Sequence, residues 1–210
     1  QGQYIDASGN VVSSASDALA ATGEGAAWVF DDAEERFRCT QNTNRPTGFV
    51  STEPLENYTH QVTVSSIDSD DDMIGVIIAY NHVSGTDGST DSYLAALRTK
   101  GGVNPTKGWG IYVLDMNVDG FSYTPVFKPV DDSNVDGNSG GWSSSTSTIR
   151  VVRSGDVITV TPSLWNNTTP DTQYKATVDL SSGSNLTAFQ GPKPYGYMAF
   201  SQNNSTAKYF

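Results

Sequence analysis

Short apolar or alternating segments, each bounded by Gly, Asn, Asp or Ser, recur along the chain from residue 27 onward. In residues 58–65 apolar and polar positions alternate, so that Tyr58, His60, Val62 and Val64 share one face. This alternation predicts a half-buried strand. Residues 73–80 (MIGVIIAY) are apolar on both faces and rich in β-branched side chains, which predicts a strand buried on both sides.

Further strands are predicted over shorter segments of the same kind. They are residues 28–31, 36–40, 93–99, 109–114, 123–128, 149–153, 157–161, 174–180 and 195–201, with a tight hairpin at Ser154, Gly155 and Asp156. No long amphipathic helix pattern occurs. Many short strands without helical crossovers predict an all-β fold, an antiparallel two-sheet β-sandwich or jelly roll.

Length and composition set the domain organisation. The chain has 210 residues of even composition, which fits one large β domain. Residues 14–21 are rich in Ala and Ser and precede Gly23, Glu24 and Gly25, so residues 1–25 are predicted to be a linker or N-terminal extension and residues 26–210 the β-sandwich domain. Cys39 is the single cysteine, which excludes an internal disulfide and favours a small buried side chain.

Charge excludes several partners. The net charge is −11 and the pI is about 4.3, which would repel nucleic acid and anionic membrane surfaces alike. The longest apolar run, residues 73–80, is too short for membrane insertion. Only 17% of residues are charged while Ser, Thr and Asn abound, a composition that favours an extracellular or virion-surface location.

Three adjacent carboxylates, Asp70, Asp71 and Asp72, run directly into the apolar strand. They repel one another at neutral pH, and a calcium ion would relieve that repulsion by taking several oxygen ligands. Asp31 and Asp32, at the end of an early strand, are predicted as further ligands, with Asp87 and Asp91 as an alternative. A solvated acidic turn is the competing interpretation.

Five segments occur in an order that resembles the concanavalin A-like lectin/glucanase jelly roll. They are residues 70–76 (DDDMIGV), 93–98 (YLAALR), 108–112 (GWGIY), 149–156 (IRVVRSGD) and 196–202 (GYMAFSQ). The acidic triplet before a Gly-containing strand resembles the thrombospondin C-terminal sub-branch, although Ala199 stands where that family has a second glycine. The resemblance implies glycan binding, often with structural calcium, as in bacterial adhesins and phage tail proteins.

The glutamates and histidines of the chain do not lie in known catalytic motifs, which disfavours catalysis. None of the five glutamates lies in the Glu-X-Asp-X-X-Glu pattern of the hydrolases of this fold, and neither His60 nor His82 lies in a lyase-like motif. His60 shares a face with Val62, which favours a structural histidine.

Sugar binding requires aromatic rings that stack on pyranose faces and planar polar groups that bond hydroxyls. Trp165 lies in a polar loop, and Tyr195, Tyr197, Asn203 and Asn204 are predicted to contact ligand with it. A packing role for Trp165 at the base of the loop is the alternative. Trp28, Trp109 and Trp142, at strand starts, are predicted to be core residues.

These observations predict a non-catalytic carbohydrate-recognition or receptor-binding module. Its partner would be a glycan or cell-surface polysaccharide, and its parent a phage tail, another virion appendage or a bacterial surface adhesin, where it can form homo-oligomers. Two alternatives remain. One is a structural virion or adhesin domain that binds no sugar, and the other is a glycan-degrading enzyme.

Overall fold

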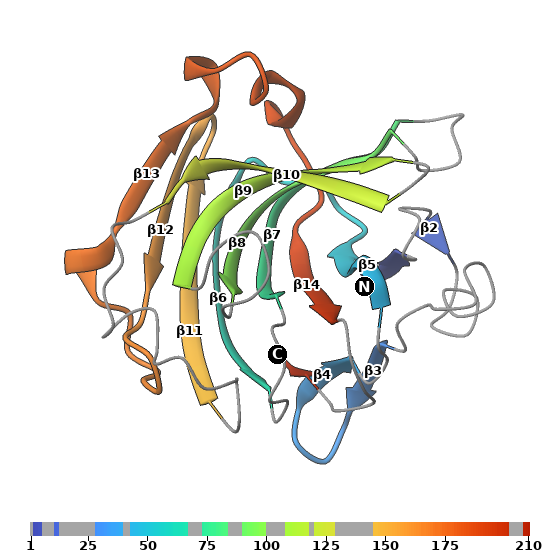
Figure 1. Ribbon diagram of the computed structural model, residues 1–210, viewed down its shortest axis with the longest axis vertical. Coiled ribbons are helices and arrows are strands. Elements are labelled where there is room, and N and C mark those ends of the chain that lie inside the picture. The colour runs from blue at the N-terminus through green and yellow to red at the C-terminus, as the bar shows by residue number, and fades with distance from the viewer. Residues whose placement is uncertain are drawn as a thin grey trace.

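A computed structural model describes residues 2–5, 11–12, 28–39, 43–66, 73–83, 90–99, 108–117, 120–128, 145–201 and 208–210. The chain is an all-β, antiparallel two-sheet β-sandwich, as the strand pattern predicted (Figure 1). Within the described ranges, no helix is long and apolar enough to cross a membrane.

One sheet has eight strands in the described part of the chain. In spatial order they are β10 (Gly120–Phe127), β9 (Gly108–Asn117), β8 (Ser92–Thr99), β7 (Met73–Asn81), β14 (Gly196–Ser201), β5 (Thr43–Ser51), β1 (Gly2–Ile5) and β2 (Val11–Val12). Its neighbouring strands are all antiparallel.

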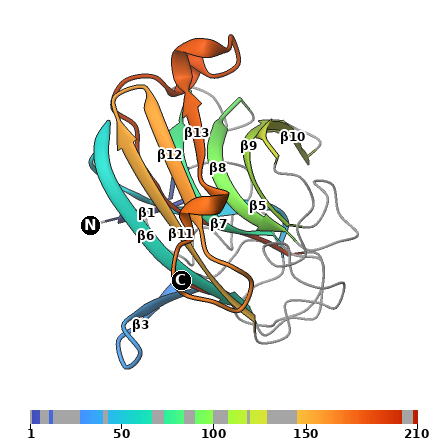
Figure 2. The ribbon, with the colours of Figure 1, turned by 90° about the vertical axis from the view of Figure 1, so that its left-hand side faces the viewer.

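The second sheet has seven described strands. They are β13 (Ala176–Asp179), β12 (Val157–Pro162), β11 (Ser145–Ser154), β6 (Asn57–Ser66), β15 (Lys208–Tyr209), β4 (Arg36–Cys39) and β3 (Trp28–Asp31). Figure 2 shows β6, β11, β12 and β13 side by side as one layer. Three short 3-10 helices, η1 (Thr172–Tyr174), η2 (Leu180–Ser182) and η3 (Thr187–Phe189), lie in the connections around β13.

The core between the sheets is built from the apolar face of each. Val62 and Val64 of β6 pack with Val76 of β7 and Ile111 of β9, all of them buried. The alternation predicted for residues 58–65 is confirmed, because even-numbered side chains of β6 are the more buried ones. Trp28 and Trp109 are buried as predicted, and so is Cys39. Trp142 lies outside the described residues.

β7 is buried on both faces, which confirms the interpretation of its continuous apolar run. A second buried cluster, which includes Met73, Ile77, Tyr93 and Met198, lies on the opposite face of the eight-stranded sheet. Around β7 and β8, apolar side chains are therefore buried on both faces of that sheet.

Four described strands were not predicted. β5 contains Pro46 and Gly48, two residues that weaken a strand pattern. β1 and β2 fall within the segment predicted to be an extension, yet they pair with β5 and with each other. β15 has two residues. Strands this short carry too few positions for an alternation to be recognised in the sequence.

A hydrogen bond at a β-bulge in β7 joins the two sheets. The pairing of β7 with β8 shifts between Ile77 and Ala79, so Ile78 has no partner residue in β8. The carbonyl oxygen of Ile78 instead accepts a hydrogen bond of 2.6 Å from the Tyr58 hydroxyl of β6. Burial raises the pKa of the Tyr58 phenol, which therefore stays a donor.

Candidate functional site

The structure does not describe five of the predicted site residues. Asp70, Asp71 and Asp72 precede β7, and Asn203 and Asn204 follow β14, all outside the described ranges. Their predicted roles in calcium and glycan binding stay predictions.

Asp31 and Asp32 lie at the β3–β4 turn. The Asp31 carboxylate is 4.0 Å from the Arg36 Nε atom, and Asp32 is exposed. A cation bound at Asp31 would have to compete with that guanidinium. Across the described ranges, no group of three or more His, Cys, Asp or Glu side chains lies close enough together to hold a metal ion.

Trp165 is half-buried and packs against the core between the sheets. The Arg98 guanidinium lies 6.0 Å from the centre of its ring, within the range of a cation–π contact. Ser163 anchors the loop, because its hydroxyl donates to the Asn167 carbonyl at 2.6 Å and its amide to the Thr148 carbonyl at 2.8 Å. This placement agrees with the packing alternative, and a ligand role for Trp165 stays untested.

Tyr195 and Tyr197 lie close together but far from Trp165. Tyr195 stacks on Tyr58, near the start of β6, with ring centres 4.3 Å apart. The neighbour of Trp165, Asn166, accepts from the amide of Thr146, which pairs with Ser65 near the other end of β6. Seven residues of strand separate the two places, roughly 20 Å. The three predicted rings therefore do not form one rim.

Two recesses meet at Tyr195. The first, called the apolar recess below, has a volume of about 300 Å³. Its lining residues come from both sheets and are Phe37, Phe49, Ser51, His60, Tyr195, Gly196 and Tyr197. The Phe37 ring centre is 4.5 Å from that of Phe49 and 5.2 Å from that of Tyr197. These rings are only half-buried, although they are as large as the fully buried rings of the core.

His60 contributes a polar ring to the lining of the apolar recess. Burial lowers the pKa of its imidazole from 6.5 to about 4, so the ring is neutral at pH 7. Its Nε2 atom is buried and has no hydrogen-bond partner among the described residues.

The second recess, called the polar recess below, has a volume of about 390 Å³. It is lined by Ser51, Thr52, Glu53, Leu55 and Tyr195. Its walls are fixed by main-chain bonds, since Leu55 and Lys193 exchange two hydrogen bonds of 3.0 and 3.2 Å and the Ser51 amide donates to the Tyr195 carbonyl at 2.8 Å. The Ser51 hydroxyl also donates to the Glu53 carbonyl at 2.8 Å.

Arg153 supports the segment that leads into Tyr195. This side chain is 1% exposed and donates to the carbonyls of Gly155, Phe189 and Gly191 at 3.0, 2.9 and 2.7 Å. Lys193 donates to the Asn81 side chain at 2.8 Å. Burial lowers the pKa of Lys193, and the positive charge of Arg153 lowers it further. Both recesses thus adjoin a firmly held main chain.

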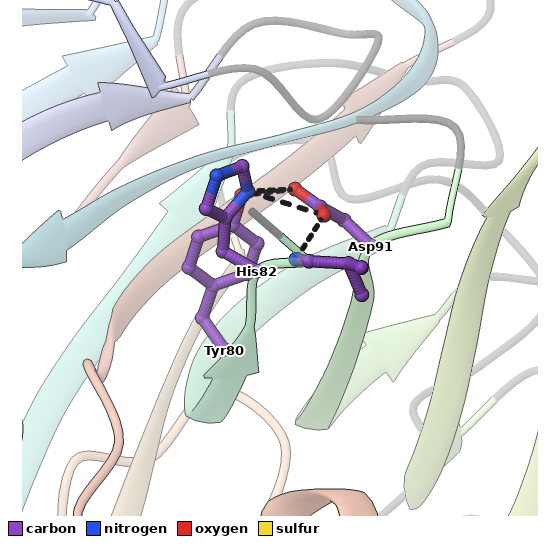
Figure 3. Close-up of polar contacts among 4 residues, drawn as sticks. Tyr80, His82 and Asp91 are labelled. Carbon is purple, nitrogen blue, oxygen red and sulfur yellow. Dashed lines mark hydrogen bonds and ion pairs between the residues drawn. The ribbon is translucent and has the colours of Figure 1, made fainter. Parts of the chain in front are cut away.

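A separate polar cluster joins the end of β7 to the start of β8 (Figure 3). The fully buried carboxylate of Asp91 accepts from the Tyr80 hydroxyl, from His82 Nδ1 at 2.9 Å and from the Val83 amide at 2.9 Å. The other ring nitrogen of His82 turns away from Asp91. Because three donors already surround Asp91, this residue fastens two strands and is a poor alternative ligand for calcium. Asp87 lies outside the described residues.

The residues that form the recesses were mostly missed in the sequence. Phe49, Ser51, Thr52 and Glu53 lie on or just after β5, which was not predicted, and no pattern places β5 beside β14. Of the recess residues, Tyr195 and Tyr197 were predicted to contact ligand, and His60 was predicted to be a structural histidine.

Comparisons with known proteins do not assign a family. No family model matches the sequence, and no curated protein matches it. The fold is similar to a xylan β-1,4-xylosidase from Bacillus halodurans C-125, at 9% identity and a TM-score of 0.46, over 87% of this chain and 33% of that one. This chain thus spans about a third of the xylosidase.

Two further structures are similar at the same remote level. One is a protein of unknown function with a galectin-like fold from Bacillus subtilis (9% identity, TM-score 0.45, 88% of this chain and 83% of that one). The other is lectin I-B4 from Griffonia simplicifolia (11% identity, TM-score 0.43, 100% and 88%). Similarities this remote assign neither a family nor a ligand.

Proposed function

We propose that this protein is a non-catalytic carbohydrate-recognition module that binds a glycan in the polar recess. The observation that carries the proposal is the lining of that recess. Tyr195 offers an aromatic ring of the kind that stacks on a pyranose, Glu53 a carboxylate, and Ser51 and Thr52 hydroxyl groups. A hydroxyl-rich ligand needs this combination.

The rigidity of the recess also supports binding. Tyr195 is stacked on Tyr58, which is itself hydrogen-bonded to the bulge in β7. The loop that carries Thr52 and Glu53 is tied to Lys193 and Tyr195 by main-chain bonds. A site formed before the ligand arrives loses less conformational entropy on binding.

Recognition without hydrolysis fits the carboxyl groups of the recess. Glycoside hydrolysis needs two of them on opposite sides of the scissile bond. Among the residues that line the polar recess, Glu53 is the single acid.

Calcium at Asp70, Asp71 and Asp72 is a second part of the proposal, and it rests on the sequence alone. Carboxylates are suitable oxygen ligands for this ion. A chelator is expected to lower the melting temperature and added calcium to restore it, because a ligand of the native state stabilises that state. A melting curve that responds to neither would exclude the calcium site.

We also propose an extracellular or virion-surface setting, in a phage tail, another virion appendage or a bacterial adhesin, with homo-oligomerisation through the parent protein. The support for this setting is the acidic, Ser-, Thr- and Asn-rich composition and the order of motifs in the sequence.

A glycan array followed by titration of the best ligand tests the proposal. Tyr195→Ala and Glu53→Gln are each expected to weaken binding about tenfold, through loss of a stacked ring and of a charge-assisted hydrogen bond. Tyr195→Phe keeps the ring and should bind nearly as well. Glu34→Gln, on the exposed β3–β4 turn, is the matched control.

Two results would contradict the proposal. The first is an array without specific binding. The second is a glycan whose affinity is unchanged by both Tyr195→Ala and Glu53→Gln in variants that melt like the parent protein. A reducing-end assay with the bound polysaccharide checks that the chain leaves it uncut.

A further inference from the structure

Among the described strands, none covers one edge of β6 over most of its length. β11 pairs with β6 along all ten residues, from Asn57 to Ser66. On the other side, β15 pairs opposite Ser65 and Ser66. Among the described residues, no strand pairs with residues 57–64 on that side. In Figure 2, β6 is the outermost of the four strands β6, β11, β12 and β13.

The unpaired main-chain groups of this edge belong to the odd-numbered residues of β6. The Gly155 amide donates to the Glu56 carbonyl across the β11 side. Along an antiparallel strand, main-chain groups point to alternate sides at successive residues. Because Glu56 bonds toward β11, Tyr58, His60 and Val62 do so too, and Thr59, Gln61 and Thr63 point their N–H and C=O groups to the open side.

β15 confirms this assignment independently. Phe210 and Phe37 exchange two main-chain hydrogen bonds of 3.1 and 2.9 Å, so Phe210 points its polar groups toward β4. Its neighbour Tyr209 must then point toward β6, where it lies opposite Ser65, an odd-numbered residue. β15 thus already uses the first bonding position of the edge that remains open from Thr63 to Asn57.

The apolar recess lies beneath the same open edge. The side chain of His60 faces inward and lines the recess, together with Phe37 of β4 and Tyr197 of β14. A strand laid beside β6 would turn every second side chain to the inner face that carries Val62 and His60, because side chains of directly paired residues share a face. Beside His60 such a side chain would enter the recess.

We propose that the open edge of β6 and the apolar recess bind an extended peptide segment of a partner protein as an added strand. The segment runs antiparallel to β6, in line with β15, and carries apolar side chains at every second position. Its main chain bonds to Thr63, Gln61 and Thr59, and its apolar side chains face inward, the one beside His60 entering the recess. A sugar or a lipid could fill the recess but could not satisfy main-chain groups repeated at strand spacing.

The test uses the whole chain and a fluorescent peptide in which four threonines alternate with four leucines, with a lysine at each end. In the proposed register the leucines face inward, the one beside His60 enters the recess, and the threonines bond to β6. N-methylation of the threonine amides is expected to weaken binding at least about tenfold, since each methyl group removes a main-chain hydrogen bond to β6. N-methylation of the leucine amides, which point away from β6, is the matched control and should have a much smaller effect.

Two variants of the protein test the same hydrogen bonds. Gln61→Pro removes an open-edge N–H group that β11 does not use, whereas Gln61→Ala keeps it, so only the proline variant should bind the peptide weakly. Hydrogen exchange should slow on peptide binding at the amides of Thr59, Gln61 and Thr63. The amides of Tyr58 and His60, already bonded to β11, should not change.

Three results would overturn the proposal, and the first two do not depend on whether Gln61→Pro folds. One is binding no stronger than that of a scrambled peptide of the same composition. Another is equal loss of affinity from both N-methylated peptides. The third is a homodimer of the parent chain that Gln61→Pro dissociates, which would make a second copy the occupant. None of these results bears on glycan binding through Glu53, which lies outside the apolar recess.

Discussion

Acidification is expected to destabilise the protein through His60. The imidazole is neutral in the folded state, where burial lowers its pKa from 6.5 to about 4. In the unfolded chain the same group takes up a proton near pH 6.5. Between these two values the unfolded state binds more protons than the folded state, so stability falls as the pH falls.

The size of the effect follows from the two pKa values. Each pKa unit corresponds to about 1.4 kcal/mol, and pH 5 lies about 1.5 units below the unfolded pKa, so His60 lowers the free energy of unfolding by about 2 kcal/mol at pH 5. The loss approaches about 3 kcal/mol near pH 4. Since the pI is about 4.3, where solubility is poor, pH 5 is the practical lower limit.

The contribution of His60 to the free energy of unfolding can be measured by urea denaturation of the parent protein and of His60→Gln at pH 7.5, 6 and 5. Carboxylates titrate in both proteins and cancel in the difference between them. The stability advantage of the parent over His60→Gln should shrink by about 2 kcal/mol from pH 7.5 to pH 5. His82→Gln retains His60 and serves as the control. A difference that stays constant across this range would refute the assignment of His60 as a buried neutral group.

Three other substitutions test the packing around the site, each by urea denaturation against the parent. Arg153→Met should destabilise by about 3 kcal/mol, because three carbonyls lose their donor, and Arg153→Lys should recover part of this; an unchanged stability would contradict its anchoring role. Gly196→Ala should cost at least about 2 kcal/mol, since the new Cβ atom would lie 2.0 Å from the Phe49 carbonyl oxygen; full tolerance would mean that β5 and β14 are less closely paired. Asp91→Asn should cost about 2 kcal/mol, because an amide cannot accept from all three donors; a neutral result would show that the cluster is not needed to fasten β7 to β8.

The sequence predicts most of the described strands but not the arrangement of the site. Residues 58–65 and 73–80 have patterns that depend on local burial, and both became strands as predicted. β5 was not predicted because Pro46 and Gly48 interrupt its strand pattern. Without β5, the positions of Phe49, Ser51 and Glu53 could not be predicted either. Trp165 looked suited to a ligand because its loop is polar, but its contact with Arg98 joins residues far apart in sequence. Such contacts are set by tertiary packing, which periodicity does not report.

The hydrogen bond from Tyr58 to the bulge at Ile78 also affects how the sandwich opens. It joins the first residues of β6 to β7, at the carbonyl of Ile78, which has no partner residue in β8. The sheets cannot part at this end unless that bond breaks and Tyr195 loses the ring on which it stacks. Amides of β6 and β7 on either side of the bond should therefore exchange together, as one cooperative unit of the native state.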